Sequence, residues 1–371
     1  MGKNANKFSF IICYNNELML SECLYYIDKL NVPEGVETDV ITISEADSMA
    51  GGYNAGLNSS DAKYKVYMHQ DVFIVNRNFI SDCIRIFEHD HQIGLIGLLG
   101  CDRIPENLVV YLSWNVGACY AANPWKVVKI EDKTKAFIND VEAVDGMLMV
   151  TSVDVTWRED IFDGWDFYDV SQAMEFHKAG YRVVVPHQGE PWCLHDCGNS
   201  KLLQYDKYRK AFSNEYRDGF SCEPDEILSK DNRELLTLCK SLEKRFSELL
   251  ASGRKKQVQD ELIEAGMAVR NGNILMLLYL IQQIDDAEGR QQHTLFWNDS
   301  STLKELTDKW NTLKFLIRRI EFGVDGDAEK KLVHKIYSGE YSWEAVILCV
   351  SHVAKNKLAV MNVILRDSFE L

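Results

Sequence analysis

Three aspartates in the first half of the chain stand where regular structure is expected to begin or end. Asp71 follows a mostly apolar run, Asp145 interrupts the apolar run 141–150, and Asp169 closes the acidic and aromatic stretch 162–169. A carboxylate in such a place can bind a divalent cation or take a proton from a substrate. For Asp71 and Asp169, capping of a turn or a helix is the competing interpretation.

The residues after Asp169 follow a helical pattern that ends at Ala179-Gly180, a sequence typical of a helix C-terminus. Asp169 therefore stands at a helix start, where the helix dipole and free amide groups stabilise a negative charge. We expect its carboxylate to be ionised, which suits a general base.

The elements that must position these aspartates alternate along the chain. Apolar, β-branched and aromatic runs predict strands, and apolar residues at helical spacing lie between several of them. The predicted strands are 8–14, 40–43, 64–75, 93–99, 141–150 and 181–186. This order predicts an α/β fold with a mostly parallel mixed sheet flanked by helices. Ligands of open α/β sheets bind at the carboxyl ends of the strands, and Asp71 falls at such an end.

Other parts of the chain are less regular or wholly helical. Residues 101–139 predict an irregular insertion over the ligand edge of the sheet, and a flap that covers the core is equally compatible with them. We expect an α/β domain over residues 1–220, a linker over 221–232 and a smaller all-helical domain over 233–371. The helical domain is compatible with acceptor binding, homo-oligomer formation or docking of a protein partner.

Composition excludes several classes of partner. The 371 residues carry a formal net charge of −15, which disfavours nucleic acid and anionic membranes, and an anionic small substrate would need a metal. The longest apolar run, 274–281, is far shorter than the roughly 20 residues that span a bilayer. Without a signal-peptide pattern, the ten cysteines are expected to be reduced thiols. We expect a cytoplasmic protein with no transmembrane segment.

A set of short motifs, taken in order, carries a family resemblance. They are Asn15-Asn16, Asn54-Ala55-Gly56, His69-Gln70-Asp71, Val144-Asp145-Gly146, Tyr168-Asp169 and Ala179-Gly180-Tyr181. Between about residues 7 and 200 the chain resembles the family 2-like inverting glycosyltransferases of GT-A fold, and especially the bacterial glycosyltransferase-like group. In that family an acid stands eleven residues before the glycine of the Ala-Gly-Tyr motif, as Asp169 does here.

The resemblance implies a donor site for a nucleotide-diphosphate sugar. Asp71 matches the last acid of the family's D-x-D motif, which binds a divalent cation, Mn²⁺ or Mg²⁺, on the diphosphate. His69 replaces the first acid, a departure that leaves two roles open: a metal ligand, or a contact to the ribose or a phosphate. The implied nucleotide-sugar contacts are Tyr14, Asn15, Asn16, Glu17, Glu45 (or Asp47), Asn54, His69, Gln70 and Asp71.

The resemblance also implies the reacting side of the site. Asp169 matches the catalytic base, and Asp145 with Gly146 matches the segment that lines the acceptor and the donor sugar. Trp165 and Asp166 are expected acceptor contacts, with packing as the alternative. A late histidine approaches the metal or the diphosphate, and His195 fits this place, with His187 as the competing candidate. A structural zinc site around Cys193, His195 and Cys197 is disfavoured, because no second ligand pair lies nearby in the sequence.

These roles predict an inverting sugar transfer to a carbohydrate or other hydroxyl acceptor by direct displacement. One alternative is a catalytically inactive glycosyltransferase-like protein that binds carbohydrate or acts as a scaffold, and His69 favours it. The other is a nucleotidyltransferase, which the absence of a glycine-rich, basic loop near the first strand disfavours.

Overall fold

The computed structural model describes residues 3–123, 126–197, 204–216, 248, 252–254 and 300–369. The chain divides into two compact units. The first comprises Met1–Ala121, Lys129–Asp196 and Leu202–Glu226, and the second comprises Ala122–Val128, Cys197–Lys201 and Ile227–Leu371. The predicted linker 221–232 lies outside the described residues, as does the predicted start of the helical domain.

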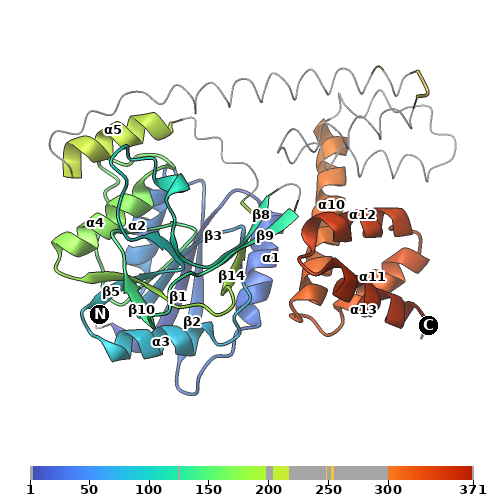
Figure 1. Ribbon diagram of the computed structural model, residues 1–371, viewed down its shortest axis with the longest axis horizontal. Helices are drawn as coiled ribbons and strands as arrows, with labels where there is room; N and C mark the ends of the chain where they lie inside the picture. The colour runs from blue at the N-terminus through green and yellow to red at the C-terminus, as the bar shows by residue number, and fades with distance from the viewer. Residues whose placement is uncertain are drawn as a thin grey trace. The chain divides into compact units, whose positions relative to one another are not determined.

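A seven-stranded sheet forms the centre of the first unit (Figure 1). Its order is β10 (Ile138–Asp140), β13 (Arg182–Pro186), β5 (Ile93–Gly97), β12 (Leu148–Thr151), β3 (Ala62–His69), β1 (Asn4–Tyr14) and β2 (Glu37–Ser44). Strand β1 is parallel to β2 and β3, and β13 is parallel to β5. Strand β12 runs antiparallel between β3 and β5, and β10 is antiparallel to β13. The predicted fold class, a mostly parallel mixed sheet with flanking helices, is confirmed.

The first unit has five described helices: α1 (Glu17–Asp28), α2 (Met49–Ser59), α3 (Phe79–His89), α4 (Tyr168–Lys178) and α5 (Tyr205–Tyr216). The side chains of Asn16 and Ser48 cap the N-termini of α1 and α2. Helix α2 packs on β1 and β2, and its small residues allow a close approach. A Cβ atom at Gly56 would lie 2.3 Å from Cγ2 of Ile11, so this packing requires glycine.

Two small sheets combine strands from the stretch 101–139, which the sequence predicts to be irregular, with strands from elsewhere in the chain. One has the order β4 (Val72–Ile74), β14 (Cys193–His195), β8 (Cys119–Asn123) and β9 (Lys126–Ile130). The other has the order β11 (Ala143–Val144), β6 (Leu99–Cys101) and β7 (Val116–Gly117). The prediction of an irregular insertion over 101–139 holds for 102–109 and 131–137, and it is wrong for the stretches that form β7, β8 and β9. These strands are two to five residues long, too short for a repeating pattern to reveal them.

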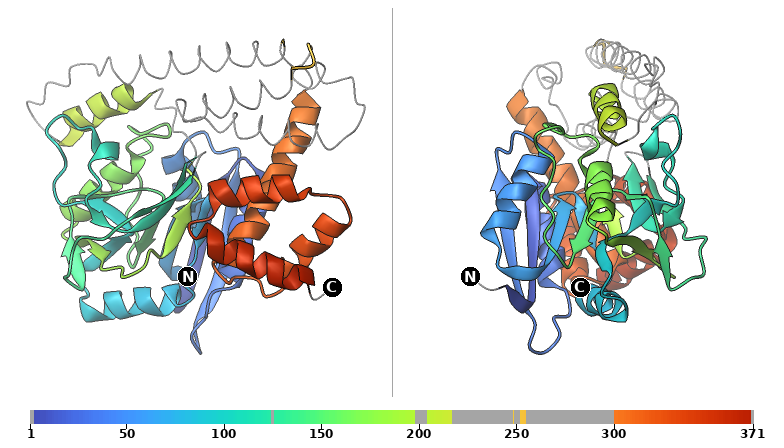
Figure 2. Two further views of the ribbon diagram at one scale, coloured as in Figure 1. Left: turned by 45° about the vertical axis from the view of Figure 1, so that its right-hand side comes forward. Right: turned by 90° about the vertical axis from the view of Figure 1, so that its left-hand side faces the viewer.

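The described helices of the second unit pack around α10 (Ser300–Glu321), which contacts α11 (Ala328–Tyr337), α12 (Trp343–Val353) and α13 (Lys357–Phe369) (Figure 2). Helix α10 is part of the helical domain predicted over 233–371, and its residues Leu313 and Ile317 are fully buried. Helix α11 was not singled out from the sequence. Among the helices that the structure describes, none has the length and apolar character needed to cross a membrane.

Candidate functional site

Strand direction brings the candidate residues to one edge of the central sheet. Strands β1, β2 and β3 are parallel and end at Tyr14, Ser44 and His69, so their carboxyl ends meet there. Strand β12 is antiparallel and begins opposite the end of β3, where Leu148 pairs with Met68. The turn that contains Asp145 and Gly146 precedes β12 and therefore lies at the same edge.

A cavity of about 250 Å³ opens at this edge. It is lined by Cys13, Tyr14, Asn15, Glu45, Ala46, Met49, His69, Gln70, Asp71 and Trp165. Glu45 has a φ of 55°, in the left-handed region that residues other than glycine rarely adopt. Such strain tends to persist where function requires it. None of these lining residues is a lysine or an arginine, so the cavity wall offers no fixed positive charge of that kind to an anionic ligand.

The side chain of Gln70 joins the end of β3 to the loop between β1 and α1. Its Oε1 accepts hydrogen bonds from the backbone amides of Asn15 and Asn16, at 3.1 and 2.9 Å. Its Nε2 donates to Oδ1 of Asn15 at 2.6 Å. Gln70 therefore fixes the loop that forms one wall of the cavity.

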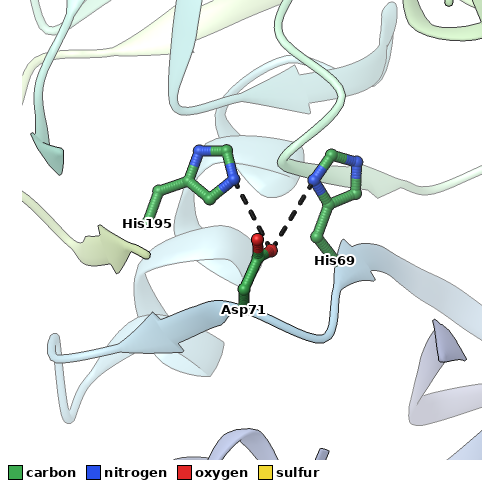
Figure 3. Close-up of side chains that lie close together, drawn as sticks. All are labelled: His69, Asp71 and His195. Carbon is green, nitrogen blue, oxygen red and sulfur yellow. Dashed lines mark ion pairs between the residues drawn. The ribbon is translucent and has the colours of Figure 1, made fainter. Parts of the chain in front are cut away.

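The residues His69, Asp71 and His195, here called the His–Asp–His cluster, converge beside the cavity (Figure 3). His69 ends β3, and Asp71 lies in the turn to β4. His195 ends β14, which pairs antiparallel with β4 so that His195 is opposite Val72. Oδ1 of Asp71 lies 3.6 Å from Nε2 of His195 and 3.9 Å from Nδ1 of His69.

The charges in this cluster depend on burial and on each other. Burial lowers the pKa of His69, so its imidazole is neutral near pH 7. Burial also acts to lower the pKa of His195, but the negative charge of Asp71 outweighs it and raises this pKa to about 9. For Asp71, burial acts to raise the pKa of the carboxyl, and the neighbouring His195 lowers it overall.

The donor set of the cluster fits a divalent cation. Oδ1 of Asp71 is buried with no partner within hydrogen-bond distance, and the nearest groups are the imidazoles of His195 and His69 at 3.6 and 3.9 Å, so a cation between them would satisfy it. One ligand atom from each of the three residues lies within 4.8 Å of the others. Metal–ligand bonds of about 2.1 Å place two ligands of one ion up to about 4.2 Å apart. Small side-chain movements would bring the three residues onto one ion.

Asp169 lies in the first turn of α4, close to the turn before β12. Its Oδ2 accepts a hydrogen bond from the amide of Gly146, and its Oδ1 accepts one from the amide of Val170, both at 2.8 Å. Burial and the nearby charge of Asp145 raise the pKa of Asp169 to about 7, because they outweigh these two amides. The expectation of a fully ionised carboxylate at a helix start is therefore wrong. Asp169 is a carboxyl that titrates near neutral pH.

Tyr168 connects Asp169 to the His–Asp–His cluster. Its hydroxyl lies 2.5 Å from Nε2 of His69. Its ring also fills the space beside Gly146, where a Cβ atom would lie 2.2 Å from the Tyr168 hydroxyl oxygen. The Asp-Gly sequence before β12 is thus explained: Gly146 provides both an amide for Asp169 and room for Tyr168.

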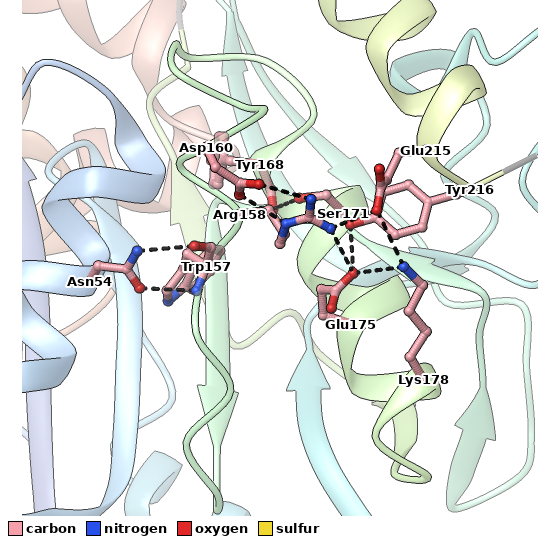
Figure 4. Close-up of polar contacts among 10 residues, drawn as sticks. All are labelled: Asn54, Trp157, Arg158, Asp160, Tyr168, Ser171, Glu175, Lys178, Glu215 and Tyr216. Atoms are coloured by element: carbon pink, nitrogen blue, oxygen red, sulfur yellow. Dashed lines mark hydrogen bonds and ion pairs between the residues drawn. The ribbon is translucent and has the colours of Figure 1, made fainter.

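Two buried residues, Trp157 and Asn54, help to hold Tyr168 in place (Figure 4). The ring of Trp157 packs against that of Tyr168, and Asn54 holds the Trp157 backbone through two hydrogen bonds of 2.9 and 3.0 Å. The next residue, Arg158, binds Asp160 and Glu215, so it joins this turn to α5. Helices α4 and α5 are also joined where the Tyr216 hydroxyl donates to Glu175.

Not all predicted site residues line the cavity. Those that line it are Tyr14, Asn15, Glu45, His69, Gln70, Asp71 and Trp165. Those that lie outside its lining are Asn16, Glu17, Asn54, Asp145, Gly146, Asp166 and Asp169. Asn54 is buried and uses its amide on Trp157. His187 pairs with Asp132 at 3.0 Å, so His195 is the histidine that joins the cluster.

The sequence interpretation did not single out Cys13, Ala46 or Met49, which line the cavity, or the contact of Tyr168 with His69. The sequence signal that could have identified the three lining residues is their position next to the ends of predicted strands. Cys13 precedes the end of β1, and Ala46 and Met49 lie between β2 and α2. A strand end delivers its neighbours to the same edge, whatever their residue type.

The fold is an α/β unit built on a mixed seven-stranded sheet. The chain matches the glycosyltransferase-like family over residues 9–216, more than half of its length, and it belongs to that family.

Several solved structures are similar at low sequence identity. The mannosyltransferase PcManGT from Pyrobaculum calidifontis, in complex with GDP-Man and Mn²⁺, is 13% identical, with 82% of this chain and 85% of that chain covered and a TM-score of 0.38. Residues 1–349 of S. aureus TarS are 10% identical, with 98% and 92% covered and a TM-score of 0.35. No curated protein sequence matches the chain.

Proposed function

We propose that this protein is an inverting glycosyltransferase that moves a sugar from a nucleotide-diphosphate sugar to a hydroxyl group of a carbohydrate or other acceptor. One observation carries the proposal beyond family membership. The cavity wall includes a buried carboxylate oxygen of Asp71 that has no hydrogen-bond partner and faces two imidazoles. Such an arrangement supports binding of a cation that would hold a diphosphate.

The donor would bind along the cavity at the ends of β1, β2 and β3. Tyr14, Asn15, Glu45 and Gln70 line it and offer an aromatic face and polar groups to a nucleoside. His69, Asp71 and His195 would hold Mn²⁺ or Mg²⁺. The ion supplies positive charge to the leaving diphosphate, which the lining residues do not supply through lysine or arginine.

Asp169 would act as the general base. A base is most effective when its pKa is near the working pH, and the pKa of Asp169 is raised to about 7. It takes the proton from the acceptor hydroxyl while that oxygen forms a bond to the anomeric carbon. The bond between the anomeric carbon and the diphosphate oxygen breaks, and the configuration inverts. The half-exposed indole of Trp165, 52% exposed, gives a sugar ring a face on which to stack.

The test is calorimetric titration of the full chain with UDP, GDP and their sugar conjugates, in Mn²⁺ and then in chelator. We expect binding that needs the metal and that Asp71→Asn abolishes. Asp169→Asn should bind the donor as the parent does but fail to transfer sugar, because the amide cannot accept the proton. Full transfer activity in Asp169→Asn would overturn the assignment of the base. Failure of the folded parent to bind any nucleotide would favour a scaffold function.

A further inference from the structure

The metal preference of the site follows from residues that depart from the family pattern. We propose that the His–Asp–His cluster selects first-row transition-metal ions such as Mn²⁺ over Mg²⁺, and that His69, positioned by Tyr168, determines this selectivity. This inference rests on the proposed function, since it concerns the cation of the same site.

The donor atoms are the basis of the inference. The cluster offers two imidazole nitrogens and one carboxylate. Mg²⁺ prefers oxygen ligands in a strict octahedron and gives up its water reluctantly. Imidazole suits transition-metal ions, whose affinity for nitrogen is higher. With histidine at position 69 instead of an acid, the site also carries one negative charge fewer, which weakens its attraction for a hard cation.

The contact between Tyr168 and His69 sets the orientation of the imidazole. A neutral imidazole carries its proton on one nitrogen and offers the lone pair of the other. The Tyr168 hydroxyl oxygen lies against Nε2 and can accept a hydrogen bond from an N–H there, and this tautomer leaves the lone pair of Nδ1 on the side of Asp71. Metal-bound histidines usually donate their second nitrogen to a partner that fixes the ring in this way. Tyr168 is therefore a positioning residue for the cation.

Tyr168 is itself held rigidly, so its effect on His69 is specific. Tyr168 is buried, and its ring packs against the rings of Tyr53 and Trp157. The ring also fills the space next to Gly146. The hydroxyl is the only group that Tyr168→Phe removes.

The test measures metal binding directly, without reference to sugar transfer. Mn²⁺ binding to the full chain is followed by electron paramagnetic resonance of the free ion, and Mg²⁺ is added as a competitor. We expect Mn²⁺ to bind more tightly than Mg²⁺ in the parent. His69→Asp should shift the preference toward Mg²⁺. Tyr168→Phe should weaken Mn²⁺ binding by about 10- to 100-fold.

A matched variant and the possible outcomes separate the two proposals. Tyr216→Phe also removes a hydroxyl hydrogen bond, but the one to Glu175 between α4 and α5, so its Mn²⁺ affinity should equal that of the parent. Equal affinity of the parent for Mn²⁺ and Mg²⁺ would overturn the selectivity and leave the proposed function standing. No Mn²⁺ binding by the parent would overturn the cation of the proposed function as well. Unchanged affinity in Tyr168→Phe would remove the positioning role.

Discussion

At the scale of single residues, Asp169 shows how surroundings decide the chemistry of a carboxyl group. Its residue type and its place at a helix start predict an ionised group, yet burial and Asp145 raise its pKa to about 7. An ionised Asp169 is therefore unfavourable for the fold. Tyr168, the preceding residue of the same helix, has a pKa that burial raises well above its ordinary value, so it stays neutral. Asp145 is the carboxylate that raises the pKa of Asp169.

This raised pKa predicts how stability depends on pH. In the unfolded chain an aspartate has a pKa of about 3.9, so between about pH 4 and 7 the folded protein keeps a proton that the unfolded chain has lost. The contribution of Asp169 to the free energy of unfolding is complete below pH 4 and is lost as the pH rises to 7. Asparagine does not titrate, so Asp169→Asn should gain stability relative to the parent between pH 5 and 7. The gain should not exceed about 1.4 kcal/mol per pH unit and should level off above pH 7.5.

Urea denaturation of both proteins at several pH values measures the difference. A suitable control is Asp160→Asn, because Arg158 lowers the pKa of Asp160 and this carboxylate stays ionised throughout the range. The difference between the control and the parent should be constant from pH 5 to 8. A similarly constant difference for Asp169→Asn would show that the pKa of Asp169 is not raised.

The residue scale also shows what the sequence could reveal about the site. Asp71 and Asp145 were recognisable because a carboxylate in or after an apolar run is unusual. The partnership of His195 with Asp71 was suggested only by the family resemblance, because it depends on the pairing of β14 with β4 across more than a hundred residues. The role of Asn54 could not be read from its type, since a buried amide and a ligand-binding amide have the same sequence signature.

At the scale of elements, the buried side chain of Asn54 ties α2 to the turn at Trp157 by hydrogen bonds. Oδ1 of Asn54 accepts from the Trp157 amide, and Nδ2 donates to the Trp157 carbonyl. Trp157 is 1% exposed, so water cannot replace these bonds. The Trp157 ring packs against Tyr53 and against Tyr168, the first residue of α4. Asn54 therefore helps to position α4 through Trp157.

Replacing Asn54 with alanine should destabilise the protein by about 2 to 4 kcal/mol, because a buried amide and a buried carbonyl lose their partners. Asn115→Ala is the matched control. Asn115 makes the same pair of bonds, with the backbone and side chain of Asp102, but it is exposed, so water can satisfy Asp102 and little stability should be lost. Denaturation midpoints compare the two variants. A loss of nucleotide affinity in Asn54→Ala without a loss of stability would instead make Asn54 a donor contact.

The long elements of the first unit were predictable, whereas most short strands were not. Strands β4 and β11 lie inside the predicted strands 64–75 and 141–150, but their place in separate small sheets was not predicted. Strands such as β1 and β3 carry enough consecutive apolar residues to reveal themselves, and helix α3 shows its buried face by spacing. Strands β6, β7 and β11 have two or three residues each. They exist because tertiary packing places their edges together, and no local pattern encodes that pairing. The element that carries His195, β14, belongs to this second group.

At the scale of the whole molecule, the net negative charge of the chain and the acidic residues of the cavity wall both affect how an anionic ligand could bind. The chain carries a net charge of −15, and the cavity includes Glu45 and Asp71 in its wall. An anionic ligand therefore meets repulsion both from the molecule and from the cavity, and the His–Asp–His cluster is where a cation would reverse it. Composition predicts that an anionic ligand would need a metal, whereas the position of the candidate site required the fold.

Comparison of nucleosides with nucleoside diphosphates tests this reasoning. Uridine and guanosine carry no phosphate, so their binding should be the same in Mn²⁺ and in chelator. UDP or GDP should bind more tightly than its nucleoside in Mn²⁺ and no more tightly in chelator, with a loss of at least about tenfold, or 1.4 kcal/mol, on removal of the metal. Calorimetry at fixed ionic strength measures all four cases. Diphosphate binding that survives chelation would mean that a basic group outside the cavity lining neutralises the phosphates, and the cation would then be dispensable for holding the donor.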